Sequence, residues 1–303
     1  MARGAHRSHL DFMDINLFLL QLVTGLALGS VFVLLALGLS LIFGMLTVVN
    51  FAHGAYFMVG ASIGAYLYGL TGQFWLSVVI VPIVVGVMGL LTERFLVRPL
   101  YGRGIDYPLL LTFGLSYVLV ECVRIVFGID GLQMGTPASL RGAVNIGVGQ
   151  FPLYRLFLIV ATAVIVLALW LVIEKTRFGL IIRAGARDPE IVRILGVDIS
   201  KVWLIVFAIG TGIAGLSGIL AAPIRAVNPE MGIPVLAESF VVTVIGGMGS
   251  LVGAVIAGLL VGVVYSLTSL YAPDYAEMSI FALMALVLLV RPQGLFGRPG
   301  LMS

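Results

Sequence analysis

Residues that could carry covalent or metal chemistry are few in this 303-residue sequence. It contains three histidines and one cysteine, at His6, His9, His53 and Cys122. Both lysines stand outside the GxxxxGK[S/T] pattern of an ATP-binding loop, because Lys175 follows Glu174 and Lys201 follows Ser200. The sequence therefore predicts no enzyme activity, with no catalytic residue, no metal site and no cofactor.

One pair of charged residues lies within an apolar stretch. Glu121 and Arg124 are three residues apart, so on a helix they share one face and can form an ion pair. We interpret them as a self-neutralising structural pair, with a functional role inside a membrane as the alternative. No row of acidic residues crosses the apolar segments, which disfavours a proton-coupled carrier. A carrier that binds a coupling ion through carbonyl and hydroxyl oxygens stays open.

The composition indicates a membrane protein. Hydrophobic residues make up 61% of the chain and charged residues only 10%, whereas soluble domains carry about 25% charged residues. Apolar segments are expected at 15–43, 51–70, 74–97, 107–127, 153–173, 202–222, 236–268 and 277–290. The formal charge of +3 comes from basic residues in the loops between these segments and does not indicate nucleic-acid binding. We predict one membrane domain over residues 1–303.

Basic residues predict which ends of the segments are cytoplasmic. Arg94 and Arg98 flank one loop, the 174–201 loop holds both lysines, and Arg291 and Arg298 lie near the C-terminus. Placing all three regions in the cytoplasm requires an even number of crossings after residue 201, although three apolar segments follow. The side of the N-terminus is left open.

Glycine-rich interruptions would reconcile the three apolar segments with an even number of crossings. The segment 236–268 is too long for one ordinary span and contains Ile-Gly-Gly-Met-Gly-Ser at 245–250, while the stretch 15–70 is interrupted near 44–54. We predict an all-α fold of about eight transmembrane helices with broken or re-entrant elements near these two sites. The candidate translocation residues are Asn50, His53, Gly54, Gly246, Gly247, Gly249 and Ser250. Simple helix kinks at glycine are the alternative.

The 174–201 loop contains a helix with clear start and stop signals. Asp188 suits the N-cap, Pro189 the first helical position, and Gly196 the stop. Between them Ile191, Ile194 and Leu195 form one apolar face. Such a helix could dock into a partner or fold back onto its own membrane domain.

Seven sequence runs stand out along the chain: GLALGS at 25–30, ALGLSLIFG at 36–44, NFAHG at 50–54, ARDPE at 186–190, LGV at 195–197, FVVTVIGGMGSLVG at 240–253 and RPQGLFG at 291–297. Together they resemble the permease subunits of bacterial branched-chain amino-acid ABC transporters. They cover nearly the full chain in the expected order.

The resemblance implies a function and a set of partners. A bacterial inner-membrane permease of this family would import leucine, isoleucine and valine, together with a second related permease, two cytoplasmic ATPases and an external substrate-binding protein. The helix at 188–196 would be the coupling helix, with Asp188, Glu190 and Arg193 orienting it on the ATPase and the apolar face filling a groove there. Urea or short amides are the rival substrates within the family, and an ion-coupled carrier or a membrane scaffold are the rival classes.

Overall fold

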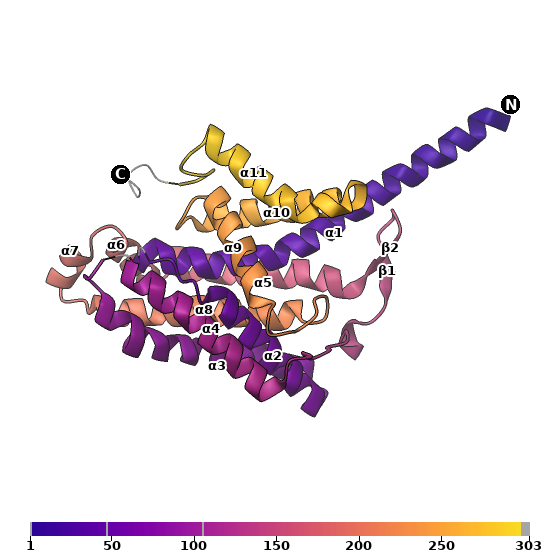
Figure 1. The fold of residues 1–303 in the computed structure, drawn as a ribbon. Helices are drawn as coiled ribbons and strands as arrows, with labels where there is room; N and C mark the ends of the chain where they lie inside the picture. Colours follow the sequence, from indigo (N-terminus) through magenta and orange to yellow (C-terminus); the bar gives the residue numbers. More distant parts are fainter. Residues whose placement is uncertain (1, 47, 105, 298–303) are drawn as a thin grey trace.

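The computed structural model describes residues 2–46, 48–104 and 106–297, with side chains from residue 15 onward. This part of the chain is almost wholly helical (Figure 1). Its helices are α1 (Ala2–Leu46), α2 (His53–Thr71), α3 (Phe74–Thr92), α4 (Asp106–Phe127), α5 (Leu153–Lys175), α6 (Arg177–Gly185), α7 (Pro189–Ile194), α8 (Ile199–Ala221), α9 (Gly232–Gly246), α10 (Leu251–Tyr271) and α11 (Ala276–Val290). Short π-helical or 3-10 turns lie at Glu93–Val97, Arg98–Leu100, Ala138–Leu140 and Pro273–Tyr275.

The predicted all-α polytopic fold is confirmed. Seven helical stretches in the described ranges are long and apolar enough to cross a membrane: Ile15–Leu46, Phe74–Leu100, Asp106–Phe127, Leu153–Lys175, Ile199–Ala221, Leu251–Tyr271 and Pro273–Val290. The predicted segment 51–70 corresponds to α2, a helix of 19 residues whose first half is almost completely buried. The segment 236–268 divides into the short α9 and the full-length α10.

Helices α1 and α8 form the centre of the molecule. Most of their residues are buried, whereas α4, α5 and α11 expose many apolar side chains, as expected of helices that face lipid. Glycines allow close contact between central helices. A Cβ added at Gly60 of α2 would lie 2.4 Å from Gly215 Cα of α8, and one at Gly262 of α10 would lie 2.3 Å from Gly29 Cα of α1.

One end of the molecule, which we call the loop end, carries α6 and α7 (Figure 1). Three other regions reach it. Arg98 donates through Nη2 to the Ser200 carbonyl at 2.9 Å, and Gly44 near the end of α1 lies against Gly249. The Leu295 N–H donates to the carbonyl of Ile245 at 2.8 Å, which brings the C-terminal segment to the same end. The three basic regions therefore share one side, although Arg298 lies outside the described residues.

The opposite end carries the start of α1, because this single helix runs from there to the loop end (Figure 1). The segment 128–152 lies there too, as predicted for an outer loop. It contains a small antiparallel hairpin, β1 (Ala143–Asn145) with β2 (Gln150–Pro152). A backbone bridge between Leu132 and Val227 ties the outer segment to the loop before α9.

Candidate coupling and translocation sites

Helix α7 has the start and stop that the sequence predicts. The Asp188 carboxylate accepts the backbone N–H groups of Glu190 and Ile191 through Oδ1, each at 3.0 Å. Pro189 occupies the first helical position, and Gly196 has a positive φ of 84° just after the helix. The N-cap satisfies donors that a six-residue helix leaves without intrahelical partners.

The apolar face of α7 is largely exposed, and Ile191 and Leu195 of this face also border a cavity described below. The exposed fractions are 57% for Ile191, 83% for Ile194 and 75% for Leu195. The anchor is Val192, which is only 5% exposed and packs into the main hydrophobic core. Sequence reasoning missed Val192, although it is the one apolar residue of the helix outside the predicted face. The result is an exposed apolar surface on a short helix that is held in place at the loop end.

Helix α6 supports α7 and was not predicted. Thr176 caps it by accepting the Gly179 N–H at 3.1 Å. Arg183 then donates to the Glu174 carboxylate at 2.6 Å and to the Ile173 carbonyl at 2.5 Å, both at the end of α5. These contacts hold the segment before α7 against the membrane helices. Helix α7 therefore extends from a segment that is fixed in place.

The predicted break at 245–250 is present. Helix α9 ends at Gly246, Gly247 and Gly249 have φ values of 96° and 80°, and Ser250 caps α10 by accepting the Gly253 N–H at 3.1 Å. The carbonyls of Ile245 and Gly246 accept the N–H groups of Leu295 and Phe296. The C-terminal segment therefore satisfies two of the carbonyls at the end of α9.

The predicted break near 44–54 is also present, between the end of α1 at Leu46 and the start of α2 at His53. Asn50 and His53 are completely buried. The Asn50 side chain accepts the Ala52 N–H at 3.1 Å, and His53 Nε2 lies 3.0 Å from the Leu35 carbonyl of α1. Two nitrogens, Asn50 Nδ2 and His53 Nδ1, have no partner among the described residues.

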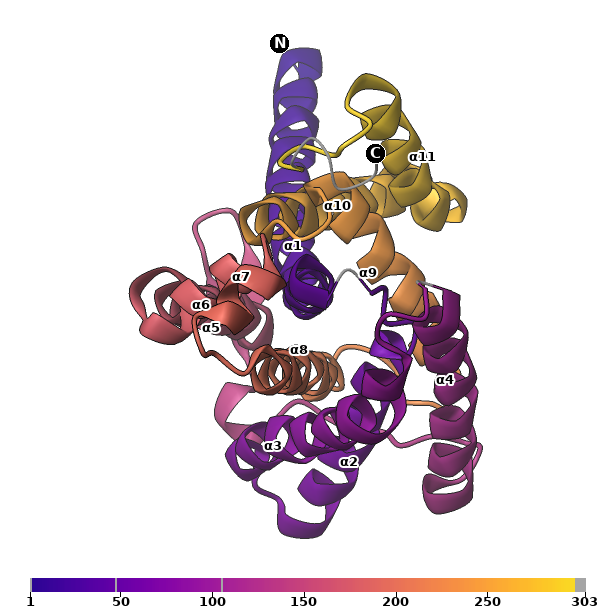
Figure 2. The same ribbon diagram turned by 90° about the vertical axis from the view of Figure 1, so that its left-hand side faces the viewer.

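The candidate residues of the two breaks do not form one cluster, although Gly44 at the start of the first break lies against Gly249 in the second. Gly54 packs against Gly232 at the start of α9, and Gly246 lies at the end of the same helix. Gly246 is fourteen residues after Gly232 on this helix, which corresponds to a rise of about 21 Å. The candidate translocation residues thus form two groups joined by α9, instead of one central site. Figure 2 views the molecule along its helices from the loop end, with α9 between α10 and α4.

Two ion pairs with partly buried arginines were missed by the sequence reasoning. Glu93 is fully buried and accepts from Arg98 at 3.0 Å and from the Tyr101 hydroxyl at 3.0 Å. Arg225 lies 2.9 Å from Glu238. Glu238 lies in the middle of α9. Glu93 and Arg98 are five residues apart across a π-helical turn, and Arg225 and Glu238 are 13 residues apart, so the i, i+3 and i, i+4 spacing of a regular helix gives no signal for either pair.

The pair Glu121–Arg124 forms as predicted, with 3.2 Å between Nη1 and Oε2. Arg124 also contacts Glu230, in the loop before α9. Together the three charges join the outer end of α4 to that loop. This favours the structural interpretation of the pair.

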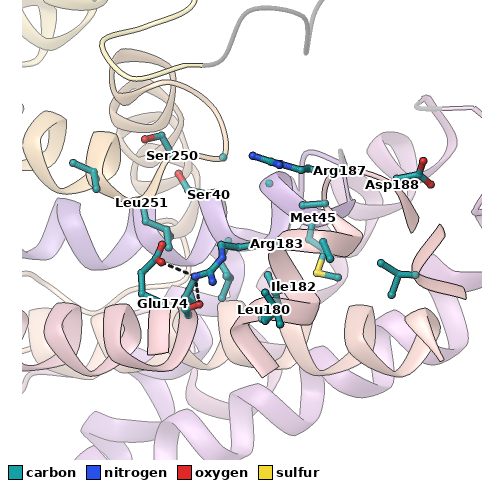
Figure 3. A pocket seen from close by; sticks show the side chains of 18 of the residues that line it. Ser40, Met45, Glu174, Leu180, Ile182, Arg183, Arg187, Asp188, Ser250 and Leu251 are labelled. Atoms are coloured by element: carbon teal, nitrogen blue, oxygen red, sulfur yellow. Dashed lines mark hydrogen bonds and ion pairs between the residues drawn. The ribbon is translucent and has the colours of Figure 1, made fainter. Parts of the chain in front are cut away.

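A cavity of about 1050 Å³ opens at the loop end (Figure 3). Its walls come from the last turns of α1 and α5, from α6 and α7, and from the glycine break before α10. Ser40 and Met45 belong to the α1 wall, Arg187 to the loop between α6 and α7, and Ser250 and Leu251 to the break. The cavity therefore brings the α7 region and the second break to one site, which the sequence did not predict.

Comparison with known proteins identifies the family. Residues 21–288 match the family model described as branched-chain amino acid transport system / permease component. The high-affinity branched-chain amino acid transport system permease protein BraD of Pseudomonas aeruginosa is 30% identical over 302 residues, covering 94% of this chain and 98% of that protein. LivH of Escherichia coli, described in the same words, is 30% identical over 93% of this chain and 96% of its own length.

A more distant relative is the probable branched-chain amino acid transport permease protein LivH of Methanocaldococcus jannaschii, 28% identical over 89% of each chain. No solved structure gives a significant match. The family match includes residues of every helix from α1 to α11, and the described residues contain seven helices that are long and apolar enough to span a membrane. This multi-pass membrane protein therefore belongs to the family of branched-chain amino acid transport system permease components.

Proposed function

We propose that the chain is a permease subunit of an ABC importer in the bacterial inner (plasma) membrane, and that it translocates leucine, isoleucine and valine into the cell. Near full-length similarity to BraD and LivH, both named as branched-chain amino acid permeases, supports the substrate class. In this proposal the chain catalyses no reaction, and separate ATPase subunits hydrolyse ATP.

The observation that carries the proposal is the exposed face of α7. Three adjacent apolar side chains, Ile191, Ile194 and Leu195, are exposed on a capped helix at the end where the basic loops gather. An exposed apolar patch rimmed by charges is typical of a protein contact site. We assign it to the ATPase, whose groove would take the apolar face while Asp188, Glu190 and Arg193 orient the helix.

Movement at α7 can reach the membrane helices through defined contacts. Val192 packs into the core, and the cavity beside α7 is lined on its other side by the break before α10. We propose that the breaks at 50–54 and 246–250 act as joints that alternate access to the path. A second related permease would complete the path in a heterodimer, and an external binding protein would deliver the amino acid at the end opposite α7.

The test is to purify the binding protein encoded with this permease and measure which ligands it binds. Tight binding of leucine, isoleucine and valine supports the proposal. Preference for urea or a short amide would retain the transporter class and replace the substrate. Uptake that depends on an ion gradient and needs no ATPase would instead indicate a secondary carrier.

A further inference from the structure

The cavity at the loop end contains polar groups that the coupling role of α7 does not use. Ser40 in its α1 wall is 1% exposed, and its hydroxyl has no hydrogen-bond partner among the described residues. Arg187 reaches from the loop before α7 across the cavity toward the break that carries Ser250 (Figure 3). In the described part of the chain its guanidinium has no ion-pair partner. A buried hydroxyl without a partner is costly unless a ligand or water satisfies it.

The charges around the cavity balance. Two guanidinium groups, Arg183 and Arg187, line it together with two carboxylates, Glu174 and Asp188. Arg183 is held by Glu174 at 2.6 Å, whereas Asp188 uses only Oδ1 for its two capping hydrogen bonds. A site with one free cation and free carboxylate oxygens matches a zwitterion better than an anion.

The remaining walls are apolar and suit an aliphatic side chain. Leu41 and Met45 of α1, Ile182 of α6 and Leu251 of α10 face the cavity. A volume of about 1050 Å³ exceeds that of one amino acid, so hydrating water would share the space. Apolar walls with a few convergent polar groups are the usual composition of a small-molecule site.

We propose that this cavity binds a free aliphatic α-amino acid on the cytoplasmic side, and that its occupation slows ATP-driven turnover. The inference rests on the proposed function, because it gives the transported substrate a second, inhibitory site. Arg187 holds the carboxylate, Glu174 accepts from the ammonium, and the side chain lies against Leu41 and Leu251.

Inhibition is expected because two opposite walls of the cavity belong to different parts of the molecule. Arg187 and Ile191 lie on the α7 side, and Ser250 and Leu251 lie on the α10 side. An amino acid in contact with both sides resists their relative movement, and it can shift the equilibrium only by binding one arrangement more tightly than the other. A high internal concentration therefore holds the transporter in the arrangement seen here.

The experiment uses the assembled transporter in inside-out vesicles of neutral phosphatidylcholine, so that the loop end faces the added solution. ATP hydrolysis is measured while leucine, or leucinamide, which lacks the carboxylate, is added. We expect leucine to inhibit hydrolysis and leucinamide to inhibit it much less. Arg187→Gln should raise the half-inhibitory leucine concentration about tenfold, because a charge-assisted hydrogen bond is lost. Each variant is compared with its own uninhibited rate.

Two further variants separate the site from general effects of charge. Ser40→Ala keeps the α1 helix and should raise the half-inhibitory concentration, whereas Arg177→Gln, in the same loop but outside the cavity, should leave it unchanged. The inference is overturned by absence of leucine inhibition, by equal inhibition by leucinamide, by equal shifts for Arg177→Gln and Arg187→Gln, or by inhibition that follows added anionic phosphatidylglycerol instead of leucine. A transporter that takes up no branched-chain amino acid would refute the proposed function itself.

Discussion

Ile194 is the most exposed apolar side chain of α7, with 83% of its surface accessible. Because this side chain is so exposed, changing it to Asp should leave the fold of the chain intact. The change puts a charge into the proposed apolar contact with the ATPase. Burying an unpaired charge there costs several kcal/mol. We expect Ile194→Asp to insert into the membrane normally and to lose co-purification with the ATPase subunits.

The matched control is Ile129→Asp, since Ile129 is 74% exposed and lies at the opposite end of the molecule. It should retain the ATPase subunits. Normal co-purification by Ile194→Asp would remove the assignment of α7 as the coupling helix.

Glu93 gives a second prediction for a single residue. It is fully buried and accepts hydrogen bonds from Arg98 and Tyr101, and Arg98 also reaches the Ser200 carbonyl at the start of α8. Glu93→Ala leaves the Arg98 charge without its carboxylate. Because Arg98 is partly exposed, we expect the free energy of unfolding to fall by about 2 to 3 kcal/mol, at the lower limit for a broken buried pair. The measurement is unfolding of the purified permease in detergent.

The exposed pair Glu121–Arg124 provides the comparison. Glu121→Ala leaves Arg124 with Glu230 as a partner, and exposed pairs contribute less than about 1 kcal/mol. A cost for Glu121→Ala equal to that for Glu93→Ala would show that the Glu93 cluster does not hold α3 against α8.

Local signals at the residue scale were sufficient for α7 but not for its surroundings. Asp188, Pro189 and Gly196 act within a few residues of one another, so the sequence alone predicts the start and stop of the helix. Val192 is buried against residues distant in the sequence, and Glu93 contacts Arg98 and Tyr101 through an irregular turn. No spacing rule contains that information, because tertiary contacts decide which side of a short helix is buried.

The break between α9 and α10 is the element whose geometry makes the clearest prediction. A Cβ added at Gly247 would lie 2.3 Å from the Gly297 nitrogen, and its φ of 96° disfavours any side chain. Backbone strain of this kind costs about 1 to 3 kcal/mol. We expect Gly247→Ala to reduce leucine uptake in cells more strongly than it reduces the amount of permease in the membrane.

Gly114 in α4 is the control, since a Cβ added there meets nothing within 4 Å. Gly114→Ala should be neutral or stabilising by up to about 1 kcal/mol, as expected for a glycine in a regular helix. Equal uptake by the two variants would mean that Gly247 has no special role in transport.

The sequence predicted both broken elements from length, apolar runs and glycine. The sequence placed the start of the apolar segment 236–268 at residue 236, whereas α9 begins at Gly232. The helix can begin earlier because Pro234 is tolerated in a first helical turn. Sequence reasoning also missed that residues 291–297 supply the N–H groups for the end of α9. That cap depends on how the C-terminal segment folds back, which local patterns do not specify.

The arrangement of the whole molecule predicts which positions each side of the membrane can reach. In a chain with Cys122→Ser, Arg187→Cys should react with a membrane-impermeant thiol reagent only from the cytoplasm, and Arg141→Cys only from outside. Ile15→Cys should also react from outside, because α1 runs as one helix to the loop end. Labelling of positions 187 and 141 from the same side would contradict the topology.

The most direct test of the account is accumulation of radiolabelled leucine in vesicles that contain this permease, its partner permease and the ATPase subunits, with the binding protein supplied on the outer side. The account predicts ATP-dependent accumulation of leucine, with competition from isoleucine and valine but not from urea. Ile194→Asp should abolish this accumulation, whereas Ile129→Asp should preserve it. Leucine accumulation without the ATPase subunits, or undiminished accumulation by Ile194→Asp, would contradict it.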